Sequence, residues 1–282
     1  MTRILITGAS GRVARLIAPF LTRDPDLQIR WQSRRSQALH RDWVCCDPLR
    51  DWGRFLAACR GCDAIWHLAG VTPAAKAPEY SVNTRLSRAV LRAAQQASVP
   101  VMLAMSSVAV YGRSDQAFAE DSPTNPEGAY GQSKLEMEQA LRQADGRPTQ
   151  LRLLRVGNVL GADALMQGQP RPTWLDQFPD GRTPVRSYIA PVSLARVMKK
   201  LSEPALDHDI WNVAASDALE MADLLRAAGL RWSQAPAPAN ALPNAILDTT
   251  RLQKFMGRVD QPTSAADMVT EWQAQSLQSV VA

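Results

Sequence analysis

The stretch RILITGASGRVA, residues 3–14, passes from an apolar run directly into glycines and small residues. Gly8 and Gly11 stand three apart, and Ala14 follows after the same interval. This spacing between a strand and a helix is typical of loops that bring the backbone close to a phosphate, because glycine places no side chain in the way. The helix N-terminus that follows would add amide donors and positive potential. Two glycines three apart also occur in ordinary tight turns, so the rest of the chain has to supply the context.

Short apolar runs alternate with helical patterns along the first half of the chain. We expect strands at residues 3–7, 27–32, 42–46, 64–70, 99–107 and 149–156, and helices at 12–22, 51–60, 80–97 and 128–143. Near-continuous apolar strands separated by helices indicate a parallel sheet that is covered on both faces. Because such crossovers are right-handed, the economical fold is α/β, a doubly wound parallel sheet of the Rossmann type. In that fold the glycine loop is interpreted as a nucleotide cradle.

The pattern changes beyond residue 160. Residues 161–190 carry prolines and glycines with little periodicity, which predicts loops and short elements. A helix at 192–201 and a strand at 209–215 resume the earlier pattern, and the Pro/Ala-rich residues 235–243 predict a loop before a last helical region. The second half therefore contributes a smaller region beside the sheet.

Composition excludes several classes of protein. The 282 residues are 46% hydrophobic and carry a net charge of +5, and their basic residues are scattered rather than gathered into a stripe with aromatics. No nucleic-acid partner is therefore expected. No apolar run is long enough for a membrane helix, and Gly8 interrupts the N-terminal run too early for a signal peptide. We expect a cytoplasmic protein with no membrane partner.

Four cysteines, Cys45, Cys46, Cys59 and Cys62, lie close together in the chain. A zinc site or a C-x-x-C redox pair is one interpretation of this spacing. The cysteines also stand near the ends of an expected strand and an expected helix, which favours thiols packed in the core. We expect reduced thiols and no metal site.

The segment YGQSK places Tyr130 and Lys134 four residues apart, on one face of an expected helix. A tyrosine has an ordinary pKa of about 10 and is a poor base at neutral pH. We expect the Lys134 ammonium to lower the pKa of Tyr130, which lets the phenol exchange a proton with a substrate hydroxyl or carbonyl. Ser106 and Ser107 end the preceding strand, at the edge where open α/β sheets bind ligands. We expect Ser107 to hold the substrate oxygen and Ser106 to cap the strand; a surface Tyr and Lys on an amphipathic helix is the alternative.

Further motifs follow in a fixed order. TGASGRVA (7–14) is similar to a TGxxGxxG/A loop, and it is followed by CDPLRD (46–51), IWHLAG (65–70), SVNTRLSRAVLRAA (81–94), SSVAVYG (106–112), YGQSKLEME (130–138), LRVGNVLG (154–161) and DTTRLQKFMG (248–257). Taken together, these motifs resemble those of the extended short-chain dehydrogenase/reductase superfamily, in its sugar-nucleotide epimerase/dehydratase branch. The resemblance runs nearly from end to end.

The resemblance implies a division of the chain and a set of site residues. Residues 1–160 would form an NAD(P)-binding Rossmann domain to which 191–213 return, and residues 161–190 and 214–282 a small substrate-binding region. The implied catalytic residues are Ser107, Tyr130 and Lys134, with Lys134 also holding the nicotinamide ribose. The implied cofactor-binding residues are Gly8, Ser10, Gly11, Arg12, Val13, Ser33, Arg34, Asp47, Pro48, Leu68, Ala69, Gly70, Asn83, Tyr130, Lys134 and Val156.

The chain also departs from that pattern. Val156 stands where many members have proline, and YIAPVSLA (188–195) lacks the acidic pair of a usual YIHVDDLA. Positions 108 and 109 are Val and Ala, without the Asp-Glu that 4,6-dehydratases carry there, so no elimination chemistry is expected. The region 161–190 is short for a nucleotide-diphosphate site. Arg171, Arg182 and Arg186 either hold an anionic substrate or lie on a solvated surface.

The first functional hypothesis is an NAD(P)-dependent oxidoreductase that transfers hydride to or from a carbonyl or hydroxyl carbon of a small, sugar-derived molecule. The alternative within the superfamily is an NAD(P)-dependent epimerase acting on a sugar or sugar nucleotide, which returns its cofactor unchanged. A non-catalytic regulator that senses dinucleotides is the alternative of another class. Such a regulator has no need of the complete Ser, Tyr and Lys set.

The end of the second strand bears on the choice of cofactor. Residues 27–32 lead into Ser33, Arg34 and Arg35, with no acidic residue before Asp42. An arginine at this place suits the 2′-phosphate of NADP, whereas a carboxylate suits the ribose of NAD. We expect a preference for NADP, with NAD as the alternative, and Arg12 approaching the same phosphate from the other side.

The helices at 80–97 and 128–143 bear on assembly. AVLRAAQQA and LEMEQALRQA offer small and apolar residues at helical spacing, and the corresponding helices form a dimer interface in the superfamily. We expect a homodimer, although an intramolecular core face would show the same pattern.

Overall fold

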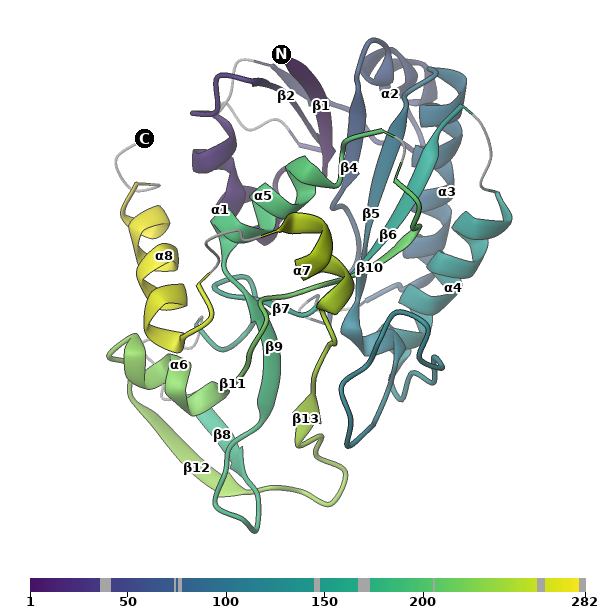
Figure 1. Ribbon diagram of the computed structural model, residues 1–282. Coiled ribbons are helices and arrows are strands. Elements are labelled where there is room, and N and C mark those ends of the chain that lie inside the picture. Colours follow the sequence, from purple (N-terminus) through teal and green to yellow (C-terminus); the bar gives the residue numbers. More distant parts are fainter. Residues whose placement is uncertain are drawn as a thin grey trace.

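A seven-stranded parallel sheet forms the centre of the computed structural model, which describes residues 1–35, 42–73, 75, 78–144, 148–166, 173–204, 206–257 and 262–278 (Figure 1). The strand order is β10-β6-β5-β4-β1-β2-β3. The strands are β1 (Thr2–Thr7), β2 (Leu27–Ser33), β3 (Trp43–Cys45), β4 (Ala64–His67), β5 (Val101–Ser107), β6 (Gln150–Val156) and β10 (Ile210–Val213). This is the doubly wound α/β sheet predicted from the alternating pattern, and that prediction is confirmed.

Helices cover both faces of the sheet (Figure 1). The helices α1 (Arg12–Leu21) and α5 (Pro191–Lys200) lie on one face, and α2 (Trp52–Cys59), α3 (Ser81–Gln96) and α4 (Ala129–Gln143) lie on the other. Successive residues of β1 point to opposite faces, so Ile4 and Ile6 pack in the core under α1 and α5, whereas Leu5 packs in the core under α2, α3 and α4. This double burial explains why the strand is apolar at every position rather than at alternate ones.

The second half adds smaller elements, most of which lie below the sheet in Figure 1, while its last two helices pack higher up, one against β10 and one beside α1 and α5. They are β7 (Asn158–Val159), β8 (Thr173–Gln177), β9 (Val185–Ile189), β11 (Ala218–Glu220), α6 (Met221–Ala227), β12 (Trp232–Pro236), β13 (Asn244–Ala245), α7 (Thr250–Met256) and α8 (Ala265–Gln278). These elements have an apolar core of their own, which includes Leu160, Tyr188, Leu224 and Met268. Between them in sequence, α5 packs on α1, and β10 extends the large sheet beside β6. The loop expected at 235–243 overlaps the last two residues of β12.

A carboxylate from α8 caps the start of α5. Glu271 Oε1 accepts hydrogen bonds from the backbone amides of Val192 (2.8 Å) and Ser193 (3.2 Å), and Oε2 accepts from the Ser193 hydroxyl (3.0 Å). No side chain of α5 itself caps this end. Residues 188–195, which have no acidic pair of their own, therefore receive a carboxylate from a residue 78 positions further along the chain.

We expect Glu271→Ala to lower the free energy of unfolding by about 1–2 kcal/mol, because the helix amides lose their charged acceptor. Urea unfolding of the variant checks this value. Glu136→Ala, at an exposed position of α4, is the control and should change stability by less than about 0.5 kcal/mol. Equal effects of the two substitutions would show that the cap contributes nothing.

Across the described part of the chain, no helix combines the length and the apolar character needed to cross a bilayer.

Candidate active site

The carboxyl ends of all seven strands meet at one edge of the sheet, because every pair is parallel. Next to each other at the centre, β1 leads into α1 on one face, while β4 leads towards α3 on the other. Such a switch point is where open α/β sheets bind ligands. The residues predicted from the motifs lie around this edge.

The backbone conformation at position 8 and the close approach of Ala69 can both be accommodated only by glycine. Its φ of +71° is left-handed, and a Cβ built on it would lie 2.6 Å from Ala69 Cα and 2.7 Å from Ala69 N. The loop after β1 thus rests directly on the loop after β4, which carries Leu68, Ala69 and Gly70. The Gly11 amide donates to the Gly8 carbonyl (2.8 Å) and closes the turn.

The N-terminus of α1 suits an anion. Its first residue outside the helix is the exposed Gly11, and its first turn holds neither a side-chain cap nor an acidic residue. Ser10 and Val13, on either side, are half-buried. An uncapped helix start behind a glycine turn is a site for a pyrophosphate, so these residues fit a dinucleotide.

His67 links the central strands rather than performing chemistry. Its Nδ1 lies 2.8 Å from Thr7 Oγ1, and its Nε2 lies 2.8 Å from Ser87 Oγ. Burial, with a smaller contribution from the Lys134 charge, lowers the pKa of His67 to about 3. The neutral imidazole therefore ties β1 and β4 to α3.

Asn83 fastens the loop after β4. Its Oδ1 accepts from the Val71 amide (2.7 Å), and its Nδ2 donates to the Val71 carbonyl (3.2 Å) and to Ser133 Oγ (3.1 Å). These three polar contacts of the fully buried side chain are all to protein atoms. Asn83 therefore holds Gly70 beside α4 and shapes the expected cofactor site from behind.

Tyr130 and Ser107 come together at the end of β5. The Ser107 hydroxyl lies next to the Tyr130 phenol and accepts from the Ala109 amide (3.2 Å), and Tyr130 is half-buried with its ring centroid 6.1 Å from that of Tyr80. A Cβ on Gly131 would overlap the Ala109 carbonyl in the turn after β5, so glycine lets α4 approach that turn closely. The sequence analysis missed this role of Gly131, although the residue stands inside YGQSK.

Lys134 is buried beside this pair. Its Nζ donates to the Met105 carbonyl (2.8 Å) and lies 6.0 Å from the centroid of the Tyr130 ring. Burial lowers the pKa of Lys134 to about 8. Burial also raises the pKa of Tyr130, and the hydrogen bond from Ser107, not the lysine charge, opposes that rise. The expectation that Lys134 lowers the pKa of Tyr130 is wrong for the protein without ligand, because the ammonium is held by a carbonyl at some distance from the phenol.

Ser106 has a different partner from the one expected. Its hydroxyl donates to Glu138 Oε1 and does not cap the strand. Glu138 is buried and forms an ion pair with Arg155, whose Nη2 lies 2.8 Å from Oε2. The helical spacing of Tyr130, Lys134 and Glu138 was the signal that would have found this carboxylate.

Val156 and Leu68 are the apolar residues expected beside the cofactor. Val156 is buried and pairs in register with Ser107 at the ends of β6 and β5. Leu68 packs on the core under α1 and α5.

The end of β2 carries the residues expected near the adenosine. Ser33 is buried, and its hydroxyl donates to the Arg35 carbonyl and accepts from Trp43 Nε1 (3.2 Å), so both its roles are filled by the protein. Arg34 is exposed. Arg12 donates through Nη1 to the Ala162 carbonyl (2.9 Å), which holds its guanidinium beside the loop after β7.

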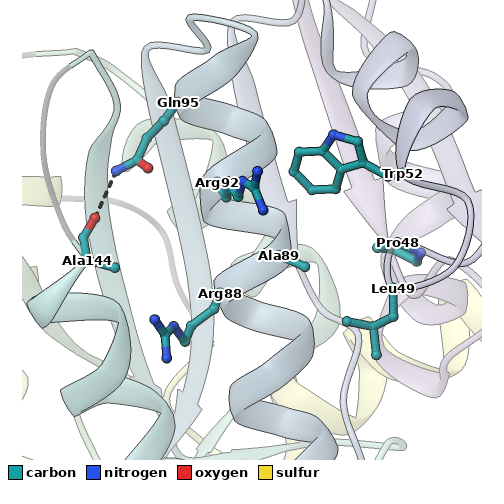
Figure 2. Close-up of a pocket in the computed structure, with 8 residues that line it drawn as sticks. All are labelled: Pro48, Leu49, Trp52, Arg88, Ala89, Arg92, Gln95 and Ala144. Carbon is teal, nitrogen blue, oxygen red and sulfur yellow. Dashed lines mark hydrogen bonds between the residues drawn. The ribbon is translucent and has the colours of Figure 1, made fainter.

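Asp47 and Pro48 form the turn between β3 and α2. Asp47 Oδ1 accepts from the Leu49 amide (2.9 Å), and Pro48 is buried. Pro48 and Leu49 also line a surface pocket of about 570 Å³ between α2 and α3, where the Arg92 guanidinium lies 4.9 Å from the Trp52 ring centroid (Figure 2). Its lining includes no residue of the Ser107 and Tyr130 pair.

The cysteines are free thiols. Burial raises the pKa of Cys46 to about 11 and raises the pKa values of Cys59 and Cys62 as well, which makes these thiols unreactive at neutral pH. Among the residues whose placement is described, no three His, Cys, Asp or Glu side chains gather into a metal site.

The arginines considered for an anionic substrate are largely committed elsewhere. Arg171 lies outside the described residues. Arg182 is exposed and pairs with Asp180 (2.7 Å), and Arg186 donates to the carbonyls of Leu242 (2.7 Å) and Pro243 (2.9 Å).

A model of the NAD dependent epimerase/dehydratase family matches residues 4–185. The UDP-glucose 4-epimerase of Azospirillum brasilense is 40% identical over 119 residues, which cover 39% of this chain and 34% of that protein. The chain spans less than half the length of the curated relatives it matches.

Two solved structures share the fold over nearly the whole chain. A UDP-glucose-4-epimerase from Stenotrophomonas maltophila, with bound NAD and formylated UDP-arabinopyranose, has a TM-score of 0.79 at 21% identity and covers 100% of both chains. A short-chain dehydrogenase/reductase superfamily protein from Agrobacterium tumefaciens with bound NAD has a TM-score of 0.77 at 20% identity, over 99% of this chain and 98% of that one.

The family model covers more than half of the chain, including the glycine loop, Ser107, Tyr130 and Lys134. The resemblance inferred from the ordered motifs is thereby confirmed. The chain belongs to the NAD dependent epimerase/dehydratase family.

Proposed function

We propose that this chain transfers hydride between a nicotinamide dinucleotide and a carbonyl or hydroxyl carbon of a sugar-derived substrate, through Ser107, Tyr130 and Lys134. The observation that carries the proposal is the juxtaposition of the Tyr130 and Ser107 side chains at the carboxyl edge of the sheet, with Lys134 buried beside them. The uncapped start of α1 behind Gly8 supports the dinucleotide.

Each residue has a defined task in this reaction. The bound nicotinamide supplies the carbon that accepts or donates hydride. During oxidation Tyr130 takes the hydroxyl proton of the substrate as the carbon–hydrogen bond breaks and the carbonyl forms; during reduction it returns that proton. Ser107 would hold the reacting oxygen, and Lys134 would hold the nicotinamide ribose. Because burial raises the pKa of Tyr130, the phenol has to release its proton to solvent before it can act as the base in the oxidation.

A sugar-nucleotide 4-epimerase is the second candidate, in which oxidation and reduction occur on one substrate and the cofactor leaves unchanged. The identity to a UDP-glucose 4-epimerase over 119 residues favours it. A dehydratase is less favoured, because the side chains of Val108 and Ala109 offer neither acid nor base after Ser107.

A panel of cofactors and sugar nucleotides tests these alternatives. NAD, NADP, UDP-glucose and UDP-glucuronic acid are first screened by the shift they cause in the unfolding temperature. Active pairs are then followed for free reduced cofactor, which a net oxidoreductase accumulates, and for epimerised sugar, which an epimerase produces without it. Binding of dinucleotide with neither product, across the panel, would favour a non-catalytic sensor over an enzyme.

The identity of the dinucleotide depends on the end of β2. Arg34 is exposed there, and the next acidic side chain, Asp42, lies 3.5 Å from the Arg30 guanidinium, which engages its carboxylate. These features support NADP, whereas the solved relatives described above hold NAD. We propose NADP as the tighter ligand and NAD as the alternative.

Arg34→Ala should therefore weaken NADP by roughly tenfold to a hundredfold, because one charge-assisted bond to the 2′-phosphate is lost, and leave NAD nearly unchanged. Titration of both dinucleotides into the wild type and the variant measures this. Arg15→Ala, exposed on α1, controls for the general loss of a positive charge. Equal affinities in the wild type would refute the preference.

Assembly and location are further proposals. We propose a homodimer through the outer faces of α3 and α4, which the exposed Leu49 beside α3 supports. The support is weaker than the pattern suggested, since Val90, Leu91, Ala93 and Ala94 are buried within the chain. A monomer mass from light scattering across a concentration series would contradict the dimer. A cytoplasmic location is proposed on the sequence alone.

A further inference from the structure

Three consecutive residues at the end of β5 each contact one stripe of α4. The Ser107 hydroxyl lies next to the Tyr130 phenol, Lys134 Nζ donates to the Met105 carbonyl (2.8 Å), and Ser106 Oγ donates to Glu138 Oε1. The stripe has the helical i, i+4, i+8 spacing, so its members stand one above another along α4. The contacts of Ser107 and Met105 involve the proposed catalytic residues. The third belongs to a carboxylate to which the proposed reaction gives no task.

Glu138 is itself held from a third element. Arg155, on β6, donates through Nη2 to Oε2 (2.8 Å) and through Nε to both carboxylate oxygens (3.2 Å each). Arg155 in turn donates to the Glu120 carbonyl (3.1 Å) and lies 4.7 Å from the Tyr111 ring centroid. The carboxylate is therefore fixed in position, and it fixes Ser106.

Burial makes this arrangement informative. Glu138 and Arg155 expose only 3% and 5% of their side chains. A buried ion pair gives little net stability compared with apolar residues of similar size, because both charges lose their water. This buried ion pair is therefore better explained by the side chains that it holds in position than by a gain in the stability of the fold.

We propose that Glu138 is a positioning residue: through Ser106 it fixes the end of β5 against α4 and thereby sets the position of Ser107 against Tyr130. The catalytic consequence rests on the proposed function. A displacement of about 1 Å in a catalytic group can reduce turnover a hundredfold, so a contact that fixes Ser107 against Tyr130 has a large effect on rate. Glu138 does not touch substrate and acts only through the strand.

Ser106→Ala is the variant that tests the proposal. It removes the link between Glu138 and β5 and leaves the buried ion pair intact, whereas Glu138→Gln would leave Arg155 without its carboxylate. Ser202→Ala is the matched control: the hydroxyl of this serine is likewise buried and hydrogen-bonded, since it accepts from Trp66 Nε1 (2.7 Å) and donates to the Met198 carbonyl (2.8 Å).

The first readout is spectroscopic and needs no substrate. Each of the four tyrosines is labelled at the ring carbon that carries the hydroxyl, and the signals are assigned by Tyr→Phe variants. Ser106→Ala should move the Tyr130 signal and leave that of Tyr188 in place, and Ser202→Ala should move neither. An unmoved Tyr130 signal in Ser106→Ala would overturn the proposal, whatever the chain catalyses.

The second readout is a double-mutant cycle on turnover, with the sugar nucleotide that proves active in the panel. Ser106→Ala alone should lower turnover by roughly tenfold to a hundredfold. In a Ser107→Ala background it should cause no further loss, because its effect passes through Ser107. An equal loss in both backgrounds, or an equal loss from Ser202→Ala, would overturn the proposal. Full turnover of Tyr130→Phe would instead count against the proposed function, and the spectroscopic readout would still decide the role of Glu138.

Discussion

Tyr130→Phe should lower turnover by roughly a hundredfold to ten-thousandfold, the range usually lost with a general acid–base group. The substitution removes only the hydroxyl next to Ser107 and keeps the ring beside Tyr80. The phenol is the group at this edge that can both donate and accept the substrate proton. Lys134 is committed to the Met105 carbonyl, and burial lowers its pKa to about 8.

The measurement is steady-state turnover together with titration of the dinucleotide. Affinity for the dinucleotide should stay unchanged, because Tyr130 contributes its ring, not its proton, to the walls of the site. A fall in kcat with unchanged dinucleotide affinity separates lost proton transfer from lost binding. Turnover at the wild-type level would remove Tyr130 from the reaction and leave the proposal without its acid and base.

Tyr80→Phe is the matched control. Tyr80 packs next to the Tyr130 ring at a similar depth, and its substitution also removes one phenolic hydroxyl. If proton transfer belongs to Tyr130, this variant should keep most of its turnover. Similar losses in the two variants would indicate that the aromatic pair acts through packing.

Local patterns predicted the fold because each pattern has a local cause. The apolar run at 3–7 is buried on both faces as β1, and the break at Gly8 is required by the turn that follows. The strand and helix expected at 209–215 and 192–201 are β10 and α5, shifted by one or two residues at their ends. Boundaries differ because the last residues of an element depend on their neighbours in space.

The expected site could be placed from sequence only in part. Tyr130, Lys134 and Ser107 belong to motifs in which spacing decides the geometry, and the structure brings them together. The direction of the pKa shift of Tyr130 could not be obtained in this way, because burial is a property of the whole fold and outweighs the opposing effect of Ser107. Spacing also could not show that the Lys134 ammonium would be bound by a carbonyl of β5.

Contacts between residues that are far apart in the sequence could not be predicted, for a different reason. The cap that Glu271 supplies to α5 joins residues 78 apart, and no periodicity connects them. The partner of Ser106 lies 32 residues away on α4, although its spacing from Lys134 was a usable signal. A segment without acidic residues, such as 188–195, therefore looks incomplete in sequence when its carboxylate is supplied by another helix.

Gly8→Ala should lower the free energy of unfolding by about 2–5 kcal/mol and weaken binding of the dinucleotide. An alanine at a φ of +71° costs about 1–2 kcal/mol in strain. Its Cβ would also lie 2.6 Å from Ala69 Cα, and relieving that overlap by backbone movement costs about 1–3 kcal/mol more. Because the obstructing atom is backbone, no change of rotamer can make room, and the loop before α1 must shift away from the loop after β4.

Gly53→Ala is the matched control, and its expected change in stability has the opposite sign. Gly53 lies in α2, and a Cβ built on it meets nothing within 4 Å. Alanine there should raise stability by about 0.5–1 kcal/mol, because glycine is the poorer helix former. Urea unfolding measures both variants, and titration of NAD and NADP measures the loss of binding in Gly8→Ala. If Gly8→Ala were as stable as the wild type and bound both dinucleotides as tightly, the contact between the loops after β1 and β4 would have no part in forming the cradle.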